Sequence, residues 1–166
     1  MQSEVELLSL SIPERDDGDE RESASQRLRK LAEEYPENTQ IVTIATLTMA
    51  ASGDTETASK LLKKLENLQG IDTFQYAATA ARTSSLSGNP AAAIDTLEQF
   101  ASRNPSMSVD ALMLASEIMI NQGDPETAHD LLLAIPEEQQ TIESVFESCE
   151  LSLFLRREAN SETDKY

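Results

Sequence analysis

Small and apolar residues recur along the chain every 35 residues, and this spacing predicts a series of similar helix pairs. Gly53, Gly88 and Gly123 set the period, and an alanine follows each glycine by five residues. A leucine and a bulkier apolar residue continue the same helical face at offsets of four and three residues. Eight residues before each glycine a pair of small residues begins, which lets two helices approach closely. The repeated positions are Ala58, Ala93 and Ala128; Leu62, Leu97 and Leu132; Leu65, Phe100 and Ile135; and the pairs starting at Ala45, Ala80 and Ala115.

Each repeated glycine marks the end of one helix and the start of the next. Glycine adopts the left-handed conformation that closes a helix, and the Asp or Asn after it can cap the following helix. Pro90 and Pro125 stand in the first turn of a helix, where a missing N–H costs nothing. Loops of two or three residues make the helices of a pair antiparallel. The predicted pairs are 39–52 with 54–68, 72–87 with 90–103, and 107–121 with 125–135.

Further helices are predicted on both sides of these hairpins. Apolar residues over 3–12 predict a short helix that Pro13 ends, and a charged turn follows it. The domain boundaries that we expect are 1–21 for the short helix and charged turn, 22–136 for the repeats, 137–158 for a capping helix and 159–166 for a disordered tail.

The predicted helix over 137–158 has an apolar stripe at helical spacing. One interpretation is a cap that buries this stripe on the end of the repeats and turns Glu143, Glu147 and Glu150 to water. The other is an apolar face left for a partner or for a second copy of the chain. The stripe consists of Ile142, Val145, Phe146, Cys149, Leu153 and Phe154.

The repeat as a whole resembles the tetratricopeptide repeat, whose unit is two helices and about 34 residues. The resemblance covers roughly residues 20–140, because Ala24 lies 34 residues before Ala58 and Pro36 closes an earlier copy. The chain departs from the family pattern where a large aromatic residue is usual, at Val42, Ala77 and Leu112. The resemblance implies an all-α, right-handed α-solenoid of antiparallel helix hairpins with a C-terminal capping helix.

Composition and charge make some classes of binding partner less favourable than others. Thirty acidic and 13 basic residues give a net charge of −17, which disfavours nucleic acid and anionic lipid because both are bound through Lys and Arg. The single cysteine excludes an intramolecular disulfide and favours a reducing compartment. No signal segment and no membrane-spanning run is evident, so we expect a cytoplasmic location for the chain, whether a whole protein or an excised domain.

No residue pattern points to an enzyme. His129 is the only histidine and has no metal-ligand spacing around it, and the glycines stand at turns rather than in a phosphate-binding loop. We therefore expect no catalytic, cofactor-binding or metal-binding residues.

The resemblance implies that the first helix of each repeat lines a concave groove that binds a peptide or helix segment. The acidic chain favours a basic or amphipathic protein partner, bound by a non-catalytic adaptor or assembly module. Two alternatives stay open: a dedicated chaperone for an exported or assembling client, and a structural subunit that self-associates through residues 137–158. The groove candidates are Gln40, Thr43, Leu47, Gln75, Ala78, Arg82, Asp110, Met113, Glu117 and Asn121.

Overall fold

A computed structural model describes the backbone of residues 18–163 and the side chains of residues 24–156. Within that part of the chain the regular elements are α-helices and two short 3-10 helices, with no strand. The short helix predicted over 3–12 lies outside the described residues. The elements are α2 (Gly18–Glu34), α3 (Thr39–Ala51), α4 (Thr55–Gln69), α5 (Phe74–Leu86), α6 (Pro90–Arg103), η1 (Pro105–Met107), α7 (Ser108–Asn121), α8 (Pro125–Leu133), η2 (Glu137–Gln139) and α9 (Ile142–Thr163).

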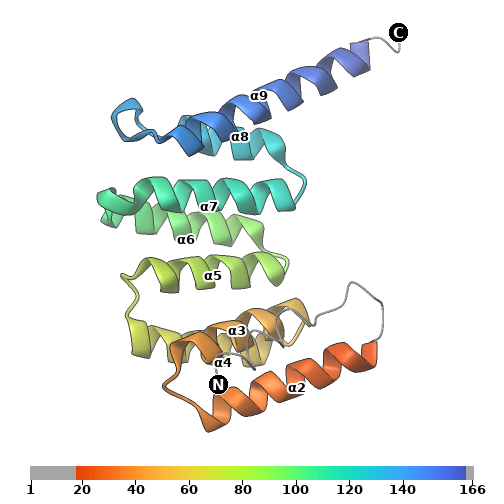
Figure 1. Ribbon diagram of the computed structural model, residues 1–166, viewed down its shortest axis with the longest axis vertical. Helices are drawn as coiled ribbons and strands as arrows, with labels where there is room; N and C mark the ends of the chain where they lie inside the picture. Colours follow the sequence, from red (N-terminus) through yellow and green to blue (C-terminus); the bar gives the residue numbers. More distant parts are fainter. Residues whose placement is uncertain (1–17, 164–166) are drawn as a thin grey trace. The chain divides into compact units, whose positions relative to one another are not determined.

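The chain divides into two compact units, Met1–Ser87 and Gly88–Tyr166. In the first unit α3 packs against α2, α4 and α5, and α4 also contacts α5. In the second unit α7 packs against α6 and α8, and α9 packs against α8 (Figure 1). The unit boundary falls inside the predicted run of repeats, 22–136. The predicted all-α class of helix hairpins is confirmed.

The repeated small residues form the helix contacts of the first unit. Ala58 of α4 is 1% exposed and clusters with Met49 and Ala50 of α3. A second cluster joins α2 to α3 and includes Leu28 and Ala45, both fully buried. The predicted repeat register is thereby confirmed in this unit, because the small positions lie where two helices meet.

The same register holds in the second unit. Ala115 of α7 and Ala128 of α8 have no exposed surface, and the two helices pack together. Ala93, Leu97 and Phe100 of α6 are also fully buried. Thr46 and Ser116, at equivalent positions of α3 and α7, are polar yet have no exposed surface. Thr46 satisfies its hydroxyl by donating to the carbonyl oxygen of Val42 at 2.7 Å.

Glycines and caps end and start the helices as the sequence predicts. Gly53, Gly88 and Gly123 all have positive φ, between 79° and 83°, so each takes the left-handed conformation. Oδ1 of Asp54 accepts a hydrogen bond from the backbone N–H of Thr57 at 3.0 Å. Thr57 lowers the pKa of Asp54 through hydrogen bonds that stabilise the charged carboxylate. The helix starts are thus specified locally, by side chains within one turn.

Helix boundaries differ from the prediction at the two ends of the chain. α2 begins at Gly18, inside the segment expected to be a charged turn, and adds a first turn to the helix expected from residue 22. At the other end, residues 137–139 form η2, and α9 runs over Ile142–Thr163 rather than 137–158. The first five residues of the expected disordered tail therefore continue the helix.

Of the two interpretations of the apolar stripe, the one in which α9 buries it is wrong. Ile142 is 87% exposed, Phe146 60% and Leu153 57%, and Cys149 is exposed as well. Ser144, by contrast, is 2% exposed. A small serine on the inner side lets α9 lie close to α8 and leaves the bulky side chains outside.

Hydrogen bonds lie both at the start of α9 and in its contact with α8. The backbone N–H of Thr141 donates to Oγ of Ser144 at 3.0 Å, and the N–H of Ser144 donates to Oγ1 of Thr141 at 3.1 Å. This reciprocal pair resembles a capping box and satisfies two backbone N–H groups of the first turn. Further along, His129 of α8 and Ser152 of α9 share a hydrogen bond of 2.7 Å. The side of α9 that carries Ser144 and Ser152 is therefore held towards the rest of the unit.

Candidate functional site

Helices α3 and α5 of the first unit enclose a surface cavity of about 500 Å³. Successive side chains along one face of each helix line it, since residues three and four apart share a face. Gln69, at the end of α4, closes one side. The lining residues are Thr39, Gln40, Thr43, Ile44, Gln69, Phe74, Gln75, Ala78, Thr79 and Arg82.

Half of the predicted groove residues meet in this cavity. Gln40 and Thr43 line it from α3, and Gln75, Ala78 and Arg82 line it from α5. The prediction used only the repeat register. These five residues meet in one cavity because equivalent faces of the first helices turn to the same side.

Leu47 and the four predicted residues of α7 do not belong to this lining. Leu47 is half-buried on α3, one turn beyond Thr43. The α7 residues belong to the second unit, where three of them are exposed and Met113 is half-buried. Their role in binding stays a prediction. These four residues are Asp110, Met113, Glu117 and Asn121.

Five lining residues were missed by the sequence analysis. Gln69 belongs to a second helix of a repeat, and the prediction considered only first helices. Phe74 stands at the first position of α5, where the turn from α4 directs it to the cavity. Thr39, Ile44 and Thr79 lie beside predicted positions on the same helices. A wider helical face would have found these three, because a groove between helices takes more than one residue per turn from each.

The cavity offers hydrogen-bonding groups and a small apolar surface, with Arg82 as its only charged side chain. Three glutamine amides, from Gln40, Gln69 and Gln75, each carry both donors and an acceptor. Oε1 of Gln69 is buried and has no hydrogen-bond partner among the described residues. A buried acceptor without a partner costs about 1–3 kcal/mol. Gln69 therefore has hydrogen-bonding capacity that the described residues leave unused.

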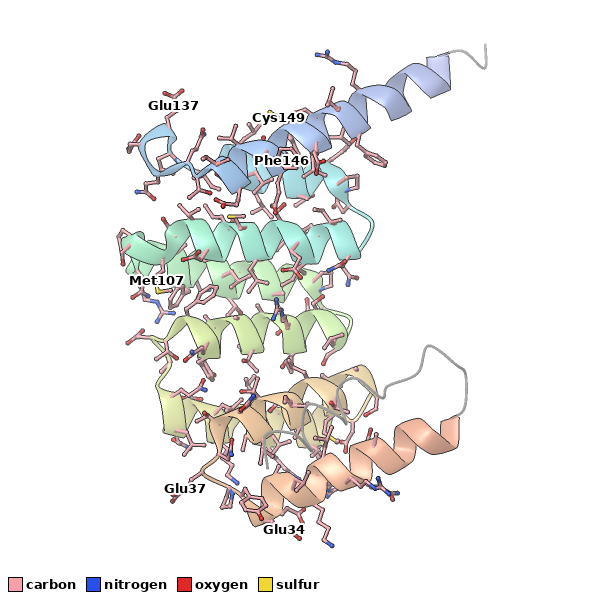
Figure 2. The ribbon with its side chains drawn as sticks, viewed as in Figure 1. Glu34, Glu37, Met107, Glu137, Phe146 and Cys149 are labelled. Carbon is pink, nitrogen blue, oxygen red and sulfur yellow. The ribbon has the colours of Figure 1, made fainter. Side chains whose placement is uncertain are left out.

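A second surface lies on α9, and we call it the α9 stripe: Ile142, Val145, Phe146, Cys149 and Leu153. Apart from the adjacent pair Val145 and Phe146, these residues lie three or four positions apart, so they share a helix face. All five are exposed, and in Figure 2 Cys149 lies on the side of α9 away from α8. Phe154, predicted as part of the same stripe, lies elsewhere and lines a separate cavity of about 470 Å³ with Ile120 and Pro125.

Within residues 24–156 no three His, Cys, Asp or Glu side chains come together to hold a metal ion. His129 bonds to Ser152 in the contact between α8 and α9, which gives it a structural role. Among the described helices, none has the length and apolar character needed to cross a bilayer.

These features define a class of protein: an array of helix hairpins with repeated small residues at the helix contacts. Residues 86–144 match the family model of the tetratricopeptide repeat, which confirms the resemblance predicted from the sequence over this segment. No curated protein and no solved structure matches the chain. Tetratricopeptide repeats are generally modules for protein–protein interaction built on a non-catalytic scaffold.

Proposed function

We propose that the chain is a non-catalytic adaptor that binds an extended peptide segment in the cavity between α3 and α5. One observation carries the proposal: five residues chosen from the repeat register line a single cavity of about 500 Å³. A cavity of this size accepts one or two side chains of a peptide, and it is too small to enclose a folded partner.

The lining chemistry favours a peptide backbone as the ligand. Glutamine amides and threonine hydroxyls can bond both the N–H and the C=O groups of an extended chain. Ile44, Phe74 and Ala78 supply an apolar floor for one ligand side chain. The unsatisfied acceptor of Gln69 adds a place where a ligand N–H gains a bond that the free protein lacks.

A basic or amphipathic peptide is favoured by long-range attraction rather than by the lining. The lining carries no carboxylate, whereas the whole chain carries a net charge of −17. Such a field raises the association rate of a positively charged ligand and is screened by salt. We therefore expect added salt to slow association while the dissociation rate changes little. The chaperone alternative would require a client that binds only when unfolded.

A cavity-filling variant tests the proposal. A phage-displayed library of random peptides would be selected against the wild-type chain, and one selected peptide would be measured by fluorescence anisotropy. Ala78→Trp places a large ring in the cavity and should weaken binding at least about tenfold, because the ring occupies the ligand volume. Ala51→Trp, at the exposed end of α3, is the matched control and should bind as the wild type does.

Circular dichroism separates loss of the site from loss of the fold. The proposal requires Ala78→Trp to keep the wild-type helical signal while losing the peptide. Unchanged binding by a folded Ala78→Trp variant would place the peptide elsewhere. Leu47→Glu then decides whether the remaining predicted residue of α3 takes part.

A further inference from the structure

The α9 stripe is apolar and open to solvent, although α9 packs against α8 along its other side. Ile142, Phe146 and Leu153 are each more than half exposed, and Val145 is 44% exposed. An exposed contiguous apolar surface on a soluble protein marks an interaction site more often than a chance arrangement. The stripe follows one helix face over three turns, so it has the shape that accepts another helix.

The two flanks of the stripe differ in charge. Glu143, Glu147 and Glu150 follow one another at spacings of four and three, so their carboxylates form a row along one flank. Glu143 and Glu150 are exposed and Glu147 is half-buried. The opposite flank carries the hydroxyl groups of Ser148 and Ser152 and, four residues further on, the exposed guanidinium of Arg156. The surface is therefore apolar in the middle, acidic on one side and without a carboxylate on the other.

We infer that the α9 stripe is the docking site for an amphipathic helix of a partner protein, with Lys or Arg residues along one flank of its apolar face. The apolar faces pack together, and the basic flank lies opposite the row of Glu143, Glu147 and Glu150. Such flanking charges select the partner and its orientation, as they do at the edges of coiled coils.

Other occupants fit this surface less well. A second copy of the chain brings two strongly acidic surfaces together, because residues 88–166 carry 15 acidic and four basic residues. A membrane-surface helix typically carries Lys and Arg beside its apolar face, and this helix carries glutamates there. A second copy and an anionic membrane would both be repelled by the glutamates of α9. A partner helix with Lys or Arg carries the opposite charge and is attracted instead.

Two synthetic amphipathic helical peptides with the same apolar face test the inference. One carries Lys on a single flank and the other carries Glu at the same positions. Isothermal titration calorimetry with the full chain should show 1:1 binding of the Lys peptide and at least tenfold weaker binding of the Glu peptide. Equal binding of the two peptides, or binding of neither, overturns the inference.

Phe146→Glu separates docking from general attraction to an acidic protein. This substitution makes the chain more negative, so purely electrostatic binding would become tighter, whereas docking on the stripe should weaken at least about tenfold. Leu86→Glu makes the same change at an exposed apolar residue of α5, away from the acidic row, and should bind the Lys peptide as the wild type does. Tighter binding by Phe146→Glu overturns the inference.

The acidic row and the oligomeric state are tested in the same series. Glu143→Lys combined with Glu150→Lys should weaken the Lys peptide about tenfold and improve the Glu peptide. Light scattering of the free chain should give the mass of a monomer, and a dimer that Phe146→Glu dissociates would assign the stripe to a second copy instead. Ala78→Trp should leave binding of the Lys peptide unchanged. The experiment therefore tests the α9 stripe separately from the proposed peptide site between α3 and α5.

Discussion

Replacing Ala58 by leucine tests the repeat register at a buried helix contact. Ala58 is 1% exposed and lies in a cluster with Met49 (3% exposed) and Ala50 (1% exposed). Leucine adds three carbon atoms where the two helices leave no space, so α3 and α4 must separate or Met49 must leave its rotamer. Overpacking of this kind costs roughly 1–3 kcal/mol of the free energy of unfolding. For a chain of this length that corresponds to a fall in the melting temperature of roughly 2–12 °C.

The measurement is thermal and urea unfolding followed by circular dichroism, with Ala51→Leu as the matched control. Ala51 is exposed at the end of α3, so the same substitution there should change the free energy of unfolding by no more than about 0.5 kcal/mol. An unchanged melting curve for Ala58→Leu would show that the repeated alanine does not mark the helix contact. A loss of similar size in both variants would indicate a general effect of leucine and would equally contradict the register.

Two further predictions concern the helix ends. Hydrogen bonds from Thr57 and Thr127 lower the pKa values of Asp54 and Asp124 below the ordinary value of 3.8. The stability that these two carboxylates contribute is therefore fully present above pH 3.8. It is lost as the pH falls through the lower pKa values that the carboxylates have in the folded chain. Between about pH 6 and pH 2 the melting temperature should therefore fall less for the double variant Asp54→Asn and Asp124→Asn than for the wild type. Asparagine keeps both helix caps and does not titrate. Gly123→Ala should lower the free energy of unfolding by about 1 kcal/mol because φ is +79° there, although a Cβ would meet no atom within 4 Å. Gly123→Asn should lower it less, since asparagine tolerates the left-handed conformation better, and urea unfolding measures both variants.

The sequence predicted most of the helices because their signals are local. Glycine, a capping residue and a small alanine recur together, and each acts within one or two turns. α3 to α8 consequently begin and end within two residues of the predicted positions. α2 was predicted too short because its first turn, Gly18–Arg21, is charged and has no apolar residue, so the hydrophobic pattern gave no sign of it.

The sequence predicted only part of the lining of the cavity between α3 and α5. The repeat register shows which face of a first helix turns inward, and this identified Gln40, Thr43 and Gln75. It does not show how far a neighbouring second helix extends, so Gln69 was missed. A residue at the end of α4 reaches the cavity only because the turn to α5 folds back, and that depends on tertiary packing.

The orientation of α9 was predicted wrongly because an apolar stripe does not say what covers it. The hydrophobic pattern correctly placed Ile142, Phe146 and Leu153 on one face, and the rule that apolar faces turn inward then failed. The observed orientation depends on tertiary contacts that the pattern does not show: Ser144 is buried, and Ser152 shares a hydrogen bond with His129 of α8. The helix turns Ser144, Leu151 and Leu155 inward and leaves the five apolar residues of the α9 stripe exposed. Because burying such a stripe within the chain would be favourable, its exposure is best explained by a partner that covers it, and the carboxylates of Glu143 and Glu150 specify a basic one.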